Sequence, residues 1–398
     1  MLNVVLTVAG LVLAAGAVYL AVPSWSEGRR AKAGLSRIDD FRQARRVLRE
    51  EYGEIVAAAR AAHPEWAADP DLEVLTRPGW VFTRPLDLDA VTTTFVNQRD
   101  RAGAERAKAA NPLVWPPAPD GEQLRCYSRA IAVHDAPGLW WDSDVYRLVG
   151  VETRADGLSL SYELGTYFDS YDTQEVLGYA AALRRLGRDA PDPKPRPDPF
   201  TYDWRCASTA VVTLTIVRTT GGPRFLMHLR DPAKVATGGG QYHVTPAGEF
   251  EPSNITPLGP GNDCDLWRNI KREYAEEFLG LDQEHDGRSG RIPDYDAGHP
   301  FAALNRARED GSLRLYALGL GAHPVTYKTE LMTVAVFDEA TFGATLGGFD
   351  HQDSEGMKNE LIDFSEANVA AYLANSNLNP FARSLLVLAQ RHRDELLG

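Results

Sequence analysis

The sequence predicts an α+β protein in which a mixed β-sheet lies between helices, preceded by a small α+β region and an N-terminal transmembrane helix. Three observations support this prediction. Residues 4–22 carry no charge, runs rich in β-branched residues fill the second half of the chain, and a helical pattern interrupts these runs. Strands separated by one helix and followed by further helices indicate a sheet packed against helices.

The uncharged segment 4–22 is long enough to cross a hydrocarbon core of roughly 30 Å. Tyr19 and Trp25 lie near its end, where aromatic side chains gather at membrane interfaces. Lys and Arg follow the segment and none precedes it, which predicts a single-pass protein of the cell membrane with the bulk of the chain in the cytoplasm. A cleaved signal peptide and a buried globular helix are the alternatives, although the basic start of a signal peptide is absent.

The chain is expected to divide into five parts along its length. A proline-rich segment near residue 195 stiffens the backbone and marks the main boundary. The parts are a membrane anchor at 1–24, a juxtamembrane helix at 25–64, a small α+β domain at 65–190, the linker at 191–204, and a domain with C-terminal helices at 205–398.

The region before the linker contains three runs that resemble strands and one helical pattern. The runs are 127–135, 145–154 and 158–169, and the helix is expected at 173–187, ending at a glycine. The sequence RADG between the second and third runs suits the turn of a hairpin.

The region after the linker contains four strand patterns. A β-branched run at 208–219 is followed by a glycine turn and its hairpin partner at 224–231. Further strands are expected at 312–324 and 330–339, and helices at 365–375 and 380–397.

The helix between these strands carries an unusual concentration of negative charge. Asp263 or Asp265 can cap its start, and Gly280 suits a left-handed cap at its end. Apolar residues recur every four positions and form a buried stripe, namely Leu266, Ile270, Tyr274 and Phe278. Glutamates at 273, 276 and 277 share another face, where like charges repel by a few tenths of a kcal/mol per pair. A divalent cation would remove this penalty, whereas a solvated acidic face needs none.

The segment REYAEEFLG, which begins at Arg272, resembles the second half of the Nudix box. Arg272, Glu273, Glu276 and Glu277 occupy the positions of its arginine and glutamates, and Gly248 resembles its opening glycine. The resemblance implies a Nudix-like sheet between helices and Mg²⁺ or Mn²⁺ held by the three glutamates. It also implies catalytic roles for Glu276 and Glu277, with Arg272 orienting the glutamates through an ion pair. The implied substrate is a small molecule, a nucleoside diphosphate linked to another moiety.

Two departures from the family pattern keep other functions open. The loop between Gly248 and Arg272 is ten residues longer than in the box, and Cys264 stands where the box has its first glutamate. These departures favour a Nudix-fold module that binds a nucleotide without hydrolysing it, whereas the intact glutamates favour the enzyme. A third hypothesis is a structural acidic helix in a membrane-anchored scaffold.

Composition limits the other function classes. A net charge of −13 argues against a nucleic-acid-binding surface. Three cysteines without a CxxC pair indicate a reducing compartment. The histidines show no zinc-ligand spacing and are interpreted as structural, namely His228, His243, His323 and His351. Composition leaves the oligomeric state undetermined.

Overall fold

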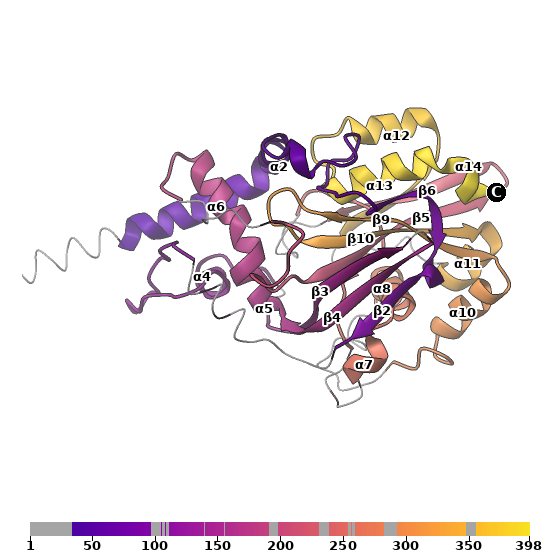
Figure 1. Cartoon of the computed structure of the whole chain (residues 1–398), viewed down its shortest axis with the longest axis horizontal. Helices are drawn as coiled ribbons and strands as arrows, with labels where there is room; N and C mark the ends of the chain where they lie inside the picture. Colours follow the sequence, from indigo (N-terminus) through magenta and orange to yellow (C-terminus); the bar gives the residue numbers. More distant parts are fainter. Residues whose placement is uncertain are drawn as a thin grey trace, which may run out of the picture.

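The computed structural model describes residues 34–96, 105, 108, 111–138, 140–154, 156–190, 198–230, 239–253, 256, 259–281, 293–347 and 356–398 (Figure 1). A large mixed sheet crosses the centre of the protein, with helices on both sides and a smaller sheet beside it.

The large sheet has eight strands in the order β1-β9-β10-β5-β6-β11, with β7 paired to β6 and β8 paired to β5. Only β10 and β5 are parallel among these pairs. The strands are β1 (Val81–Asp87), β5 (Thr209–Thr219), β6 (Gly222–Arg230), β7 (Tyr242–His243), β8 (Ala247–Glu249), β9 (Leu313–Ala322), β10 (Thr329–Asp338) and β11 (Gly356–Asp363).

The small sheet has the order β2-β4-β3, formed by β2 (Val91–Phe95), β3 (Asp144–Arg154) and β4 (Gly157–Thr166). The predicted hairpin is confirmed, because β3 and β4 are antiparallel and Arg154 faces Gly157 across the turn. The β5–β6 hairpin is confirmed in the same way, with Thr219 opposite Gly222.

Helices cover both faces of the large sheet and form a separate layer beside it (Figure 1). One face packs against α12 (Glu366–Leu373), α13 (Pro380–Arg391) and α14 (Arg393–Leu397). The other face packs against α8 (Leu266–Leu279), α10 (Phe301–Glu309), α11 (Glu339–Leu346) and the small sheet. The helical layer contains residues 34–50, α2 (Tyr52–Ala61), α4 (Tyr127–His134), η3 (Tyr171–Glu175) and α6 (Val176–Arg185). Shorter helices are η1 (Pro64–Trp66), η2 (Leu88–Ala90), α5 (Tyr167–Ser170) and α7 (Gly259–Asp263).

The core beneath α8 draws residues from both sides of the predicted linker. Tyr146 and Tyr162 of the small sheet pack against Phe250, which follows β8, with ring centroids 4.6 and 5.0 Å away. The two predicted domains thus share one core, and their division along the chain stays a prediction.

The strand predicted at 127–135 is wrong, because this segment forms α4. Tyr127, Ala130 and Ile131 are buried together at helical spacing. The apolar residues therefore recur every 3.6 residues, as in a helix, rather than every two, as in a strand. The strands β1, β2 and β11 and the helices α10 and α11 were not predicted. These elements are short, and β1 is organised by a partner distant in the chain, β9.

The predicted fold class is wrong in its membrane part. In the portion of the chain that the structure describes, no helix combines the length and the apolarity needed to cross a membrane. The segment 4–22 lies outside the described residues. The first described helix, over 34–50, is instead amphipathic and buries Phe41 and Ala44 in the helical layer. The membrane localisation stays an untested prediction.

Candidate functional site

The acidic helix α8 forms as its sequence predicts. The Asp265 carboxylate accepts a hydrogen bond from the Arg268 N–H at 2.8 Å, which caps the first turn. Gly280 ends the helix with a φ of 66°, the left-handed conformation that glycine adopts most easily. The predicted stripe from Leu266 to Phe278 is buried. These contacts fix the rotation of α8 and direct its glutamates toward β8.

Gly248 lies directly against the first glutamate of the helix. It pairs with Val211 of β5 on the face that α8 covers. A Cβ atom placed on residue 248 would lie 1.9 Å from Oε2 of Glu273. Only glycine leaves room for this approach, and Glu273 is consequently 9 % exposed.

Glu277 joins the end of α8 to the segment before Gly248. Its Oε2 accepts a hydrogen bond from the Thr245 hydroxyl at 2.6 Å, and its Oε1 accepts one from the Ala247 N–H at 2.9 Å. Both carboxylate oxygens therefore hold the loop that leads into β8.

Arg272 lies between Glu273 and Glu276 and is only 2 % exposed. Its guanidinium donates to the Glu251 carbonyl and to the Asn269 side chain, each at 3.0 Å. Nε lies 3.5 Å from Glu276 Oε1, and Nη2 lies 3.7 Å from Glu273 Oε1. Burial alone lowers the pKa of Arg272, but the fields of Tyr295 and the two glutamates outweigh it and raise the pKa above its usual value. The ion pairs implied by the family resemblance are therefore present.

The carboxylates offer the donor chemistry of a magnesium site, because Mg²⁺ prefers carboxylate oxygens. Within the ranges that the structure describes, no three His, Cys, Asp or Glu side chains are grouped to hold a metal by themselves. Mg²⁺ is commonly held by one or two carboxylates, with waters and substrate phosphates completing its shell. The donor set fits an ion shared by Glu276, Glu273 and a phosphate.

Cys264 and Asp263, near the start of α8, have structural contacts. Cys264 is buried, its carbonyl accepts a hydrogen bond from Thr93 of β2, and burial raises the pKa of its thiol to about 12. Oδ2 of Asp263 accepts hydrogen bonds from the N–H and the hydroxyl of Ser253. The structure thus places neither side chain among the glutamates of α8.

His243 and His323 are buried in the structure. Burial lowers the pKa of both His243 and His323 to about 3. Nδ1 of His323 accepts hydrogen bonds from the N–H groups of Val325 and Thr326, so its Nε2 carries the proton and faces Tyr52. His351 lies outside the described residues.

A second acidic cluster, which the sequence did not reveal, lies on the opposite face of β8. Glu249 of β8 and Glu330 of β10 flank Ala210 of β5 on the same face of the sheet. Lys328 forms an ion pair with Glu249 at 2.8 Å, and the charges of Glu330 and Glu175 also act on it. We call these four residues the Lys328 cluster. In the sequence, the only sign of this cluster is Glu330, at the start of the apolar run that forms β10.

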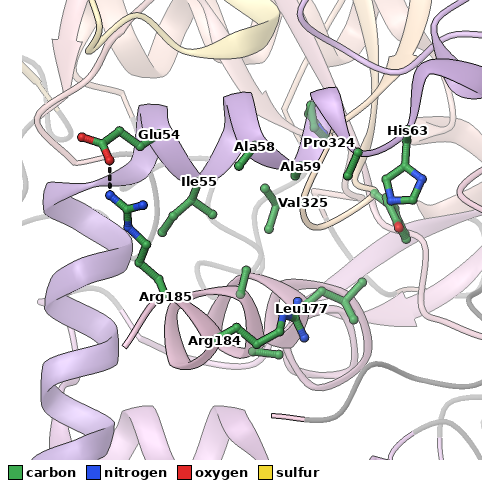
Figure 2. A pocket seen from close by; sticks show the side chains of 14 residues that line it. Glu54, Ile55, Ala58, Ala59, His63, Leu177, Arg184, Arg185, Pro324 and Val325 are labelled. Carbon is green, nitrogen blue, oxygen red and sulfur yellow. Dashed lines mark hydrogen bonds and ion pairs between the residues drawn. The ribbon is translucent and has the colours of Figure 1, made fainter. Parts of the chain in front are cut away.

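A cavity of about 300 Å³ lies between α2, α6 and the loop after β9 (Figure 2). Ile55, Leu177 and Val325 form much of its wall, and an ion pair between Glu54 and Arg185 lies at one end. None of its lining residues belongs to α8 or β8. The cavity is therefore separate from the α8 glutamates.

Comparison of the chain with models of known protein families gives no match, and neither does comparison with curated proteins. The relationship to the Nudix family therefore stays a prediction that rests on the residues of α8 and β8.

Proposed function

We propose that this protein is a Nudix-like hydrolase that cleaves a nucleoside diphosphate linked to another moiety, with Mg²⁺ or Mn²⁺ at the α8 glutamates. The observation that carries the proposal is the contact between α8 and Gly248. Residues 25 positions apart meet so closely that a methyl group on residue 248 would overlap Glu273. A solvated acidic helix would not need such an approach.

The contacts of the three glutamates suggest a different role for each. Glu276 keeps 23 % of its side chain exposed and is held by Arg272, so it is the residue best placed to meet a metal and a phosphate. Glu273 stands beside it against Gly248. Glu277 acts as a positioning residue, because both of its oxygens bind the loop before β8. A bound divalent cation would neutralise the diphosphate and help to activate water.

Binding without turnover is the second candidate function. It is favoured by the hydrogen bonds that occupy both Glu277 oxygens, and by the burial of Cys264 where the family has a glutamate. A protein of this kind would hold the same class of ligand but would release no phosphate.

A single experiment separates these functions. The full chain is incubated with a panel of nucleoside diphosphate derivatives and Mg²⁺ or Mn²⁺, and phosphate release is measured beside ligand-induced thermal shifts. We expect Glu276→Gln to reduce turnover by about 10²- to 10³-fold, because it removes charge stabilisation from the transition state. Glu309→Gln, an exposed glutamate at the end of α10, is the matched control and should keep full activity.

Ligand-induced shifts without phosphate release would reject the hydrolase and select the binding protein. Neither shifts nor turnover across the panel would reject both and leave α8 a structural helix.

A further inference from the structure

The cavity between α2, α6 and the loop after β9 has no role in the proposed hydrolase. Figure 2 shows α2 and α6 on opposite sides of it, with Val325 of the loop between them. Its volume of about 300 Å³ is at the lower end of the range for ligand-binding pockets, which often lie between helices. A water molecule takes up about 30 Å³ in the liquid, so the cavity admits a ligand of about ten non-hydrogen atoms.

The walls of the cavity are apolar and consist largely of small side chains. Both helices contribute alanines to these walls, namely Ala58 and Ala59 from α2 and Ala180 and Ala181 from α6. Small side chains usually allow two helices to pack closely. Here Val325 lies between the helices, and the alanines leave the space beside it open. Apolar space of this kind holds water poorly and accepts apolar molecules.

The loop that supplies Val325 has a strained backbone beside the cavity. Tyr327 lines the cavity, is buried, and has a φ of 61°, a left-handed conformation that is rare for a bulky residue. Its carbonyl accepts a hydrogen bond from Arg205 at 3.0 Å, which holds the loop on its other side. Strained residues of this kind gather at binding and catalytic sites. The strain is thus a second indication that the cavity binds a ligand.

The charged residues of the lining favour a ligand with an anionic end. Arg185 forms ion pairs with Glu51 and Glu54, so the charge of Glu54, which lines the cavity, is balanced. Arg184 also lines the cavity, is exposed in the last turn of α6, and donates from Nη1 to the Ala190 carbonyl at 3.2 Å. A guanidinium has five N–H donors, and two of them can bind a carboxylate side by side. Arg184 is therefore suited to the charged end of a ligand.

We propose that this cavity binds a medium-chain carboxylate of about eight carbons, with its aliphatic tail between α2 and α6 and its carboxylate at Arg184. Burial of the tail against the alanine walls removes apolar surface from water. The carboxylate stays at the exposed end of the cavity, where the guanidinium binds it. Because none of the lining residues belongs to α8 or β8, this site is independent of the proposed hydrolase.

Calorimetric titration of sodium octanoate into the full chain tests the proposal. We expect saturable binding at a single site. The uncharged 1-octanol has the same tail and should bind about 10-fold more weakly, because it cannot form the charged contact. Arg184→Gln should weaken octanoate binding by about 10-fold and leave octanol binding unchanged. Arg306→Gln, at an exposed position of α10 outside the cavity, is the control and should bind octanoate like the wild type.

Two alanine variants on α2 test the position of the tail. Ala59→Leu fills part of the cavity and should weaken octanoate binding by at least about 10-fold. Ala57→Leu adds the same side chain at an exposed position that does not line the cavity, so it should bind octanoate like the wild type. Crystals soaked in 8-bromooctanoate should show an anomalous bromine peak between α2 and α6.

Absence of saturable octanoate binding would overturn the proposal. Equal affinities for octanoate and octanol, or an octanoate affinity that Arg184→Gln does not change, would refute the carboxylate contact and with it the proposal. An equal loss of binding in Ala59→Leu and Ala57→Leu would place the tail elsewhere and also overturn it. If Ala59→Leu fails to fold, the position of the bromine peak decides the question.

Discussion

Gly248 and Glu249 are neighbours in β8, yet each faces a different acidic cluster, because successive residues of a strand point to opposite faces of the sheet. Gly248 faces the glutamates of α8, which adjoin Arg272 and the loop before β8. Glu249 faces the Lys328 cluster, where a lysine lies among three carboxylates. The two clusters share one strand but differ in how their charge is balanced.

The Lys328 cluster contains its own cation, the Lys328 ammonium, which lies 2.8 Å from Glu249. The cation next to the α8 glutamates is the planar guanidinium of Arg272, which lies 3.5 Å from Glu276 and 3.7 Å from Glu273. The ammonium of Lys328 can approach its carboxylates as a divalent ion would. Acidic residues alone therefore do not identify a metal site. The glycine contact and the partial exposure of Glu276 are what favour ligand binding at α8.

The largest effect is expected when the lysine is removed. Lys328→Met leaves Glu249, Glu330 and Glu175 without their central positive charge, and should lower the free energy of unfolding by about 3–5 kcal/mol. Chemical denaturation measures this loss. The second substitution Glu330→Gln in the same protein should recover part of it, because it removes one of the repelling charges. An unchanged midpoint in Lys328→Met would contradict the central position of the lysine.

A smaller loss is expected at the glycine of the α8 site. Gly248→Ala forces Glu273 away from β8 and should cost up to about 3 kcal/mol, as overpacked cores do. Gly343→Ala in α11 is the control, since nothing lies within 4 Å of a methyl group there and alanine favours a helix. Thermal unfolding of both variants checks the difference. Equal behaviour would show that α8 does not rest on Gly248.

Protonation should distinguish the two clusters further. Burial raises the pKa of Glu330 to about 7. The charges of Lys328 and Arg230 oppose this rise, and those of Glu249 and Glu175 reinforce it. The folded state therefore keeps a proton that the unfolded state loses near pH 4.5, so this contribution to stability is present at low pH and disappears as the pH rises toward 7.

A glutamine at position 330 does not titrate. Glu330→Gln should therefore reduce the decrease in the free energy of unfolding between pH 4.5 and 7 by about 2 kcal/mol. Denaturation curves across the range, with the wild type as reference, measure the difference. His243 and His323 act in the opposite direction, because their lowered pKa values make stability fall as the pH drops below 6.5. They are present in both proteins and cancel in the comparison. Parallel pH profiles would refute the raised pKa.

The smallest effect is expected for the hydrogen bond that holds Glu277. Thr245→Val removes one donor from a carboxylate that keeps its bond to the Ala247 N–H, and should cost about 1 kcal/mol. The turnover of the same variant tests the positioning role, which predicts a lower kcat with little change in KM. A change in KM alone would indicate that Glu277 contacts the ligand directly.

Local signals in the sequence predicted α8 well, because its caps at Asp265 and Gly280 and its apolar stripe act within one helix. The ion pair between Arg272 and Glu276 was implied by the family resemblance, and it joins residues four positions apart on one helix. The Lys328 cluster could not be predicted in this way. It joins η3, β8 and β10, and only the parallel pairing of β5 with β10 brings Glu330 beside Ala210.

The segment at 127–135 shows the same limit from the other side. Tyr127 and Ile131 suit a strand or a helix in isolation, and the helical layer that buries them decides between the two.

The most direct test of the account is a calorimetric titration of Mn²⁺ into three full-length proteins: the wild type, Glu276→Gln and Glu330→Gln. The account predicts that the wild type and Glu330→Gln bind Mn²⁺ alike, and that Glu276→Gln binds at least about 10-fold more weakly. Equal binding by wild type and Glu276→Gln, or no binding by any of the three, would contradict a metal site at α8.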